Sequence, residues 1–282
     1  MKPIRVGQLV IGGNSPLVLI AGPCVIEEAG KTFQIARELR DLTGELGIPF
    51  IFKASYDKAN RTARDAYRGP GLSRGLEILG SIREELGIPV LSDVHRFEEI
   101  DAAARVLDVV QVPAFLCRQT DFVMEIAGKA KAVNIKKGQF LAPWDAAYIA
   151  DKVAAAGNAQ LMLTERGVSF GYNNLVVDFR SFPILRKIGY PVIFDATHSV
   201  QLPGGAGRAS GGDRRMVPTL ARAAVAAGVD GLFFEVHPDP DRALCDGPNS
   251  LAMEGLPGLL VTLKRIDAVM REAGVHSAGE EA

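Results

Sequence analysis

The sequence predicts a (β/α)8 barrel with a short β-hairpin ahead of it, and three observations support this fold. Eight short apolar stretches alternate with eight stretches of helical periodicity, and no linker or shift of composition interrupts the alternation. Stretches that are apolar throughout are typical of parallel strands buried on both faces, and parallel strands need crossover helices. Eight such units in roughly 250 residues match the size of this barrel. An open doubly wound sheet is the alternative, although no Gly-x-Gly-x-x-Gly follows the first strand.

The individual elements follow from local patterns along the chain. Residues 4–14 are expected to form the hairpin, with its turn at or near Gly7 or at Gly12–Gly13. Strands are expected where apolar, β-rich residues cluster, at 17–22, 49–54, 89–93, 108–112, 132–136, 160–165, 191–196 and 230–236. Helices are expected where the apolar period is helical, at 31–46, 72–86, 98–106, 121–129, 146–156, 179–188, 216–227 and 256–273. We expect one domain over residues 1–282, with the polar residues 276–282 forming a disordered tail.

Composition narrows the classes of partner. The net charge of −1 over 282 residues provides no global field for nucleic acid or an acidic membrane, so any anion site must be local. No apolar run approaches the length of a membrane span, and the N-terminus has no signal core. Three cysteines without paired spacing argue against a disulfide framework and for a reducing compartment. We therefore expect a cytoplasmic protein that binds neither nucleic acid nor membrane.

Cationic side chains follow several predicted strands, at the end of the barrel where active sites lie. Lysine supplies a mobile point charge and arginine a planar fork, and both suit phosphate or carboxylate. A solvated basic loop would explain the cations after the second strand alone. Their recurrence after strands two, four, five and six favours more than one bound anionic group. These residues are Lys53, Lys58, Arg61, Arg118, Lys136 and Arg166.

A second chemical set follows the first, seventh and eighth strands, which are neighbours once the barrel closes. Cys24, His198 and Glu235 occupy these positions, and Asp246 shortly afterwards would complete the set. Thiolate, imidazole and carboxylate suit a borderline divalent ion such as zinc, iron, manganese or cobalt. A single cysteine or histidine is more often a buried structural group, but their joint position favours a metal site. The glycine-rich run at 203–213 fits either a mobile lid or a passive surface loop.

Several longer motifs closely resemble one enzyme family, the 3-deoxy-D-manno-octulosonate 8-phosphate synthases, over residues 15–265. That family condenses phosphoenolpyruvate with D-arabinose 5-phosphate and water and releases phosphate, supplying the eight-carbon sugar acid of lipopolysaccharide. The resemblance implies a homotetrameric barrel whose N-terminal hairpin closes the bottom. The motifs are Ala21–Cys24, Phe52–Arg61, Arg68–Gly71, Pro113–Thr120, Asn134–Lys137, Phe170–Asp178 and Phe194–His198.

The resemblance also implies roles for individual residues. Asn60 and Arg61 match contacts to the pentose phosphate, and Arg118 matches an arginine that reaches a neighbouring subunit's site. Cys24, His198, Glu235 and Asp246 match the ligands of the metal-dependent branch. Lys58, His198 and Asp246 are the candidate catalytic residues, with Lys58 either a general acid or a purely electrostatic group. The phosphoenolpyruvate contacts would be Lys53, Ser55, Lys58, Gln111, Lys136 and Arg166.

The sequence departs from the family pattern in a few places. Tyr56 and Thr62 stand where phenylalanine and serine are usual. The Cys245–Pro248 segment has the form of the metal-independent branch, where asparagine replaces Cys24; our interpretation follows Cys24, because that residue would touch the ion. The alternatives are a sibling synthase using erythrose 4-phosphate or N-acetylmannosamine, and a non-catalytic phosphosugar-binding barrel. Lys58-Ala-Asn-Arg61 argues against the erythrose enzyme, which typically carries Lys-Pro-Arg-Thr there.

Overall fold

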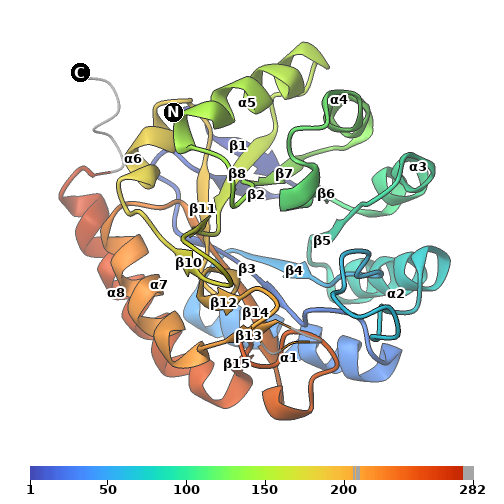
Figure 1. Cartoon of the computed structure of the whole chain (residues 1–282). Coiled ribbons are helices and arrows are strands. Elements are labelled where there is room, and N and C mark those ends of the chain that lie inside the picture. The colour runs from blue at the N-terminus through green and yellow to red at the C-terminus, as the bar shows by residue number, and fades with distance from the viewer. Residues whose placement is uncertain (206, 208–209, 276–282) are drawn as a thin grey trace.

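The computed structural model describes residues 1–205, 207 and 210–275, and in this part of the chain eight parallel strands close into a barrel (Figure 1). Each strand pairs with the next in sequence, and β14 pairs with both β11 and β3 to complete the ring. The predicted (β/α)8 fold is therefore confirmed. The barrel strands are β3 (Val18–Gly22), β4 (Phe50–Lys53), β5 (Val90–Asp93), β6 (Val109–Val112), β7 (Val133–Lys136), β8 (Leu161–Glu165), β11 (Val192–Asp195) and β14 (Gly231–His237).

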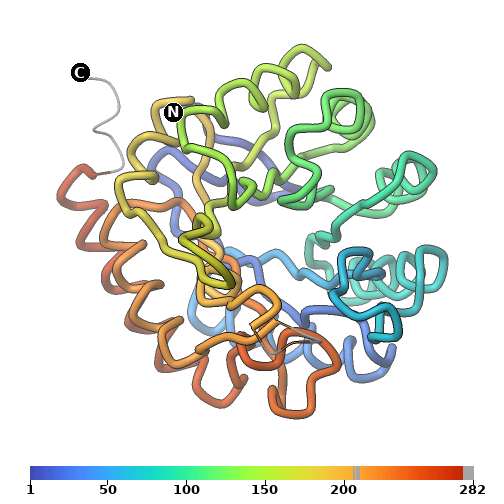
Figure 2. Tube along the Cα trace, viewed as in Figure 1, coloured from blue at the N-terminus to red at the C-terminus, as the bar shows by residue number. Residues whose placement is uncertain are grey.

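Helices surround the barrel, and the chain passes round it once in sequence order, so that the last helix contacts the first (Figure 2). Each helix buries one apolar face against the sheet, because its apolar residues recur with the helical period. The helices are α1 (Ala29–Leu46), α2 (Leu72–Leu86), α3 (Phe97–Val106), α4 (Thr120–Lys129), α5 (Ala146–Ala155), α6 (Ser181–Arg186), α7 (Val217–Ala226) and α8 (Leu256–Glu272).

Short elements decorate the loops, mainly at the C-terminal end of the strands. The two-residue strands β9 (Val168–Ser169) and β10 (Leu175–Val176) pair with each other, as do β12 (Gln201–Leu202) and β13 (Gly211–Gly212), while β15 (Leu251–Ala252) extends β14. Single 3₁₀ turns occur at Ala114–Leu116, Pro143–Asp145, His198–Val200, Arg214–Met216, Pro240–Arg242 and Met253–Gly255.

The core has two layers, one between strands and helices and one inside the barrel. Outward-facing strand residues such as Leu19 and Phe52 pack against the helices, and inward-facing residues such as Ile20, Ile51 and Phe233 fill the interior. Both faces of the strands are buried, which explains why the strand segments are apolar throughout. Complete burial of a side chain of this size stabilises the fold by about 1.5–3 kcal/mol.

The N-terminal hairpin closes the bottom of the barrel. Its strands, β1 (Ile4–Val6) and β2 (Leu9–Ile11), are antiparallel, and Gly7 in the turn between them has the left-handed φ of 57°. Ile4, Val6 and Ile11 are buried in the same apolar cluster as the interior barrel residues. The Arg5 amide donates to Gln160 Oε1, just before β8, at 2.7 Å. The opposite end of the barrel is thus the end available for a site.

Two glycines allow strands to approach more closely than any side chain would permit. A Cβ on Gly231 would lie 2.5 Å from Val18 Cγ1 and 2.6 Å from Ile193 Cδ1, where β14 closes the ring. A Cβ on Gly22 would lie 1.9 Å from the carbonyl oxygen of Lys53, where β3 and β4 lead into the loops above the barrel. Both positions therefore depend on glycine for packing rather than for backbone freedom.

The sequence also anticipated most element limits. The observed barrel strands fall within one residue of the predicted ones, while α6 is shorter than expected by two residues at each end and α7 by one. The predicted tail at 276–282 lies outside the described residues, and the glycine-rich run at 203–213, expected to be either a lid or a surface loop, lies partly outside them. Within the described ranges, no helix has the length and apolarity that crossing a membrane requires.

Candidate active site

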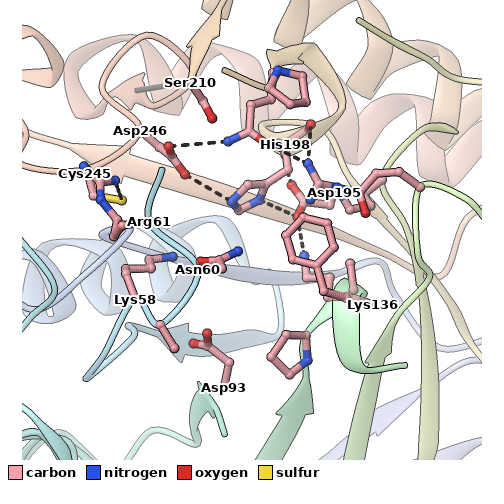
Figure 3. A pocket seen from close by; sticks show the side chains of 18 of the residues that line it. Lys58, Asn60, Arg61, Asp93, Lys136, Asp195, His198, Ser210, Cys245 and Asp246 are labelled. Atoms are coloured by element: carbon pink, nitrogen blue, oxygen red, sulfur yellow. Dashed lines mark hydrogen bonds and ion pairs between the residues drawn. The ribbon is translucent and has the colours of Figure 1, made fainter. Parts of the chain in front are cut away.

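A cavity of about 370 Å³ opens at the C-terminal ends of the barrel strands. Many side chains predicted from the strand exits line it, and Figure 3 shows several of them pointing toward one another. The loops after β4, β6, β11 and β14 contribute to its wall, so residues far apart in sequence meet there. The predicted site residues among its lining are Lys53, Lys58, Asn60, Arg61, Gln111, Lys136, Arg166, His198 and Asp246.

The floor of the cavity carries buried cations held by the barrel itself. Lys136 at the end of β7 pairs with Asp195 at the end of β11, and its Nζ lies 3.3 Å from the centroid of the Phe233 ring. Burial lowers the pKa of Lys136 to about 8, although Asp195 opposes this shift.

Arg166 donates to the His198 carbonyl at 3.1 Å and to Gln201 Oε1 at 2.9 Å. Gln111 accepts from Asn134 Nδ2 at 3.0 Å. The floor is therefore positive and preorganised, as anion binding requires.

Glu235 at the end of β14 joins the cations to the predicted metal ligands. Its Oε1 lies 3.0 Å from Lys53 Nζ, 3.5 Å from Lys58 Nζ and 3.3 Å from His198 Nε2. Burial would raise the pKa of Glu235, but His198 and the two lysines outweigh burial and lower it well below its usual range. Its second oxygen, Oε2, is buried without a hydrogen-bond partner among the described residues. A completely buried carboxylate with a free oxygen is suited to a further positive group.

The predicted metal ligands converge on one place. His198 Nε2 lies 3.7 Å from Asp246 Oδ2, and Cys24 Sγ lies 3.6 Å from the same carboxylate oxygen. The His198–Glu235–Asp246 donors all lie within 4.8 Å of one another, as do those of Cys24, Cys245 and Asp246. The Asp246 backbone has a φ of 48°, an uncommon value for a residue other than glycine. These distances suit ligands that surround an ion of the predicted class.

Asp195 orients His198 within this group. The Asp195 carboxylate lies 2.6 Å from His198 Nδ1, so Nε2 faces Asp246 (Figure 3). The same nitrogen also faces Glu235. Burial opposes a charge on the imidazole, yet Asp195 and Glu235 raise the pKa of His198 to about 10. A carboxylate on the far nitrogen is the usual partner of a metal-binding histidine. The cluster therefore favours positive charge at this position.

The rim beside β4 contains the residues matched to the pentose phosphate. Arg61 Nη1 lies 2.7 Å from Cys245 Sγ, and its Nη2 donates to the Leu244 carbonyl at 3.4 Å. Asn60 is exposed at the cavity mouth. Cys245, whose sequence context suggested the metal-independent branch, thus contacts the predicted sugar-phosphate arginine and adjoins Cys24.

Some predicted residues lie outside the cavity surface. Ser55 is buried behind Asp93, to which its hydroxyl donates at 2.5 Å. Cys24 and Glu235 lie just beneath the lining. Arg118 is exposed on the outside and does not reach the cavity of its own chain.

Sequence reasoning missed two acidic residues of the cavity, Asp93 and Asp195. Both end a barrel strand and are buried with the site's cations or histidines. Their position at a strand exit was the available signal, since it is the same signal that identified the lysines. A site that is predicted to bind anions gives no reason to expect carboxylates in its wall.

The fold and the site define a class of protein: a (β/α)8-barrel enzyme with a polycationic pocket for anionic substrates and a thiol–imidazole–carboxylate cluster beside it. Residues 2–272 match the model of the DAHP synthetase I family, and the chain belongs to that family. It is 63% identical over 271 residues to the 2-dehydro-3-deoxyphosphooctonate aldolase of Geotalea uraniireducens, covering 96% of this chain and 100% of the relative. Proteins of the same name from Trichlorobacter lovleyi and Geobacter sulfurreducens are 61% and 57% identical over 270 residues, covering 96% of this chain and 99% of each relative.

Proposed function

We propose that this chain is a 3-deoxy-D-manno-octulosonate 8-phosphate synthase, which condenses phosphoenolpyruvate with D-arabinose 5-phosphate and water and releases phosphate. The observation that carries the proposal is the buried cationic floor beside a rim formed by the exposed Asn60 and the half-buried Arg61. Phosphoenolpyruvate brings a carboxylate and a phosphate, and the pentose brings a second phosphate, so such a pocket suits them together. The relatives reported above carry the name of this activity.

The positions of the cations suggest how the substrates are oriented. Lys136, Arg166 and Lys53 would hold phosphoenolpyruvate on the floor, with Gln111 beside them, while Asn60 and Arg61 hold the pentose phosphate at the rim. This arrangement would bring C3 of the enol toward the aldehyde carbon between the two groups. The carbon–carbon bond forms between these atoms, water adds at C2, and phosphate then leaves by C–O cleavage. Fixed orientation and electrostatic stabilisation are the contributions that the protein supplies.

Lys58 stands between the floor and the metal cluster, near the place where the carbons would meet. Burial would lower the pKa of Lys58, but Cys24 and Glu235 outweigh it and raise the pKa well above its usual range. Lys58 is thus held as a cation beside Glu235. As a cation it would stabilise the negative charge that develops on the aldehyde oxygen, and as a general acid it would also donate the proton that this oxygen needs.

We further propose that Cys24, His198, Glu235 and Asp246 hold a divalent ion of the zinc, iron, manganese or cobalt group. The buried, unpartnered Oε2 of Glu235 and the borderline character of the donor set support this fit. When bound, such an ion would supply Lewis-acid polarisation of water or of the aldehyde. Asp195 would hold the His198 ring with Nε2 toward the ion.

We infer a homotetrameric, cytoplasmic enzyme as the working form. Exposed Arg118 would serve a neighbouring subunit's site, and exposed aromatic side chains nearby, including Phe115, Trp144 and Tyr148, are typical of a surface that another subunit covers. Cys24, Cys117 and Cys245 are free thiols, as expected in a reducing compartment.

The test of the activity is phosphate release from phosphoenolpyruvate with a panel of aldoses. Arabinose 5-phosphate should give a higher kcat/KM than erythrose 4-phosphate or N-acetylmannosamine. A preference for either of those would assign the chain to a sibling synthase. Binding of arabinose 5-phosphate without any phosphate release, in metal-loaded enzyme, would indicate a non-catalytic phosphosugar-binding barrel.

A further inference from the structure

A buried polar cluster at the end of β5 reaches the cavity but has no role in the proposed function. Asp93 lies at its inner end, where Oδ1 accepts from the Ser55 hydroxyl at 2.5 Å and Oδ2 lies 2.9 Å from His95 Nε2. Both Asp93 and His95 line the cavity. Figure 3 shows the Asp93 carboxylate pointing into the cavity below Lys58 and Asn60, on the side of the pentose-phosphate residues.

The outer part of the cluster is a set of buried contacts around His95. Glu99 of α3 lies behind the histidine, and its Oε2 accepts from the His95 backbone amide and from the Tyr56 hydroxyl, both at 2.9 Å. The Tyr56 and His95 rings are edge-to-face, with centroids 6.2 Å apart. Asp57 completes the surroundings of His95 and is itself paired with Arg68 at 2.8 Å. His95 is therefore confined from the β4 loop and from α3 as well as by Asp93.

Asp93 is one of three aspartates in the cavity lining, and the other two, Asp195 and Asp246, lie with the His198 group. Burial would raise the pKa of Asp93, but His95, with Lys58 and Lys53, outweighs burial and holds the pKa well below its usual range. A carboxylate accepts about four hydrogen bonds in total, and the contacts above use part of that capacity. The phosphate and carboxylate groups of the substrates would be repelled here. The substrate atoms that can approach are uncharged hydrogen-bond donors, and in the proposed reaction these are the water and the hydroxyl groups of the aldose. The position of Asp93 below Lys58 and Asn60, on the side of the pentose-phosphate residues, favours the hydroxyl groups.

We propose that Asp93 accepts a hydrogen bond from a hydroxyl group of the aldose phosphate, and that His95, Glu99 and Tyr56 are positioning residues that fix its carboxylate. This inference rests on the proposed function, because it assigns the neutral part of the aldose to a specific group. A carboxylate with a fixed direction reads the configuration of a hydroxyl as well as its presence. Asp93 is then a determinant of which pentose phosphate the enzyme accepts.

Tyr56 holds the outer end of the positioning array. The Tyr56 hydroxyl donates to Glu99 Oε2 at 2.9 Å. Tyr56 is completely buried, so this hydrogen bond is made away from solvent. Tyr56→Phe removes the hydroxyl and keeps the ring, which leaves the packing intact and loosens Glu99 alone.

The decisive experiment combines substitution of the protein with deletion of single substrate hydroxyls. The kcat/KM of wild-type enzyme and Asp93→Asn is measured with arabinose 5-phosphate and with its 2-deoxy, 3-deoxy and 4-deoxy analogues. One deletion should cost wild-type enzyme about 10- to 100-fold, because a buried charged acceptor loses its donor, and should cost Asp93→Asn only a few-fold. The difference is the coupling between Asp93 and that hydroxyl. Equal penalties in the two proteins for every analogue would overturn the proposal.

A matched control separates recognition from stability. Asp267→Asn makes the same chemical change at another buried carboxylate, which accepts from the Leu17 amide at 3.2 Å and pairs with Arg271, away from the cavity. It should leave the analogue penalties at their wild-type values even where it lowers the unfolding midpoint. If Asp93→Asn turns over too slowly, calorimetric affinities for the same analogues give the same cycle.

Tyr56→Phe tests the positioning array without touching the cavity. It should raise the KM for arabinose 5-phosphate severalfold, reduce the penalty for the same hydroxyl deletion, and leave the KM for phosphoenolpyruvate unchanged. A purely structural role would lower stability and change both KM values equally, or neither, and would refute the positioning role. Failure of wild-type enzyme to use arabinose 5-phosphate at all would instead count against the proposed function.

Discussion

At the scale of single residues, Glu235 connects the two parts of the site. Its carboxylate meets Lys53, Lys58 and His198, so it is a common counter-charge for the cationic floor and for the predicted metal ligands. Removing one partner from a buried charged group typically costs about 3–5 kcal/mol, because the others remain uncompensated. Substitution at Glu235 would thus disturb every function of the site together, whereas the neighbouring Cys24 permits a more selective test.

Substitution of Cys24 should distinguish a cluster that binds a metal ion from a cluster of closely packed side chains that does not. Chelation should abolish wild-type activity, and a borderline divalent ion should restore it. Cys24→Ser should bind metal more weakly and remain chelator-sensitive, because a hydroxyl is a poor substitute for a thiolate. Cys24→Asn should retain reduced but chelator-resistant turnover, since an amide can hydrogen-bond water or the aldehyde. The measurements are metal content and phosphate release before and after chelation.

Cys117→Ser is the control for this series, because Cys117 is another buried cysteine at a strand exit but lies away from the cluster. Its metal content should equal that of wild-type enzyme. Full activity in wild-type protein that has been stripped of metal to below stoichiometric traces would contradict the assignment.

Residue roles could be predicted from the sequence only where residue type and strand position agreed. Lys53, Lys136 and Glu235 could be selected as candidates because each lies at or near the C-terminal end of a recognisable apolar strand. Asp93 and Asp195 end strands equally well, but their importance depends on a histidine that each one meets through the fold. The sequence contains the parts of such pairs but does not show that Asp93 also binds Ser55, 38 positions earlier in the chain.

At the scale of elements, the long segments were predictable and the short ones were not. Barrel strands and helices carry their own periodicity, and Gly47 and Gly87 mark helix ends with left-handed φ values of 64° and 66°. The two-residue pairs β9–β10 and β12–β13 have too few residues to show a period. Their pairing depends on where the loops lie once the barrel has formed.

The N-terminal hairpin offers a test at this scale. Ile11 is completely buried at the bottom of the barrel, so Ile11→Ala should reduce the free energy of unfolding by about 2–5 kcal/mol. Leu9→Ala, at a partly buried position of the same strand, should cost clearly less. Urea titration measures both. The kcat of the folded protein should not change, because the cavity is at the opposite end; a large loss of kcat in fully folded Ile11→Ala would show that the hairpin shapes the site.

At the scale of the whole molecule, the role proposed for the exposed Arg118 in a neighbouring subunit's site predicts that subunits complete one another's sites. Arg118→Ala should lower kcat/KM about 10- to 100-fold, since hydrogen bonds to charged groups contribute about 1.5–3 kcal/mol. Arg74→Ala, at an exposed arginine on α2, should have little effect. Mixed oligomers of Arg118→Ala and Lys58→Ala subunits should recover activity that neither homo-oligomer has. Full activity from a monomer, identified by light scattering, would refute this arrangement.

The N-terminal hairpin under the barrel also affects the route by which substrates and products reach the cavity. Because Ile4, Val6 and Ile11 close the bottom of the barrel, the substrates and products of the proposed reaction would enter and leave at the C-terminal end of the described strands. The side chains buried deep in the cavity are Lys53, Gln111 and Lys136, whereas Asn60 is exposed at the cavity mouth. A substrate held by the deep lysines would have to bind before the substrate held at Asn60, and it could dissociate only after that substrate had left. A cavity that is closed at its inner end therefore implies ordered binding of the two substrates, and this order follows from the fold.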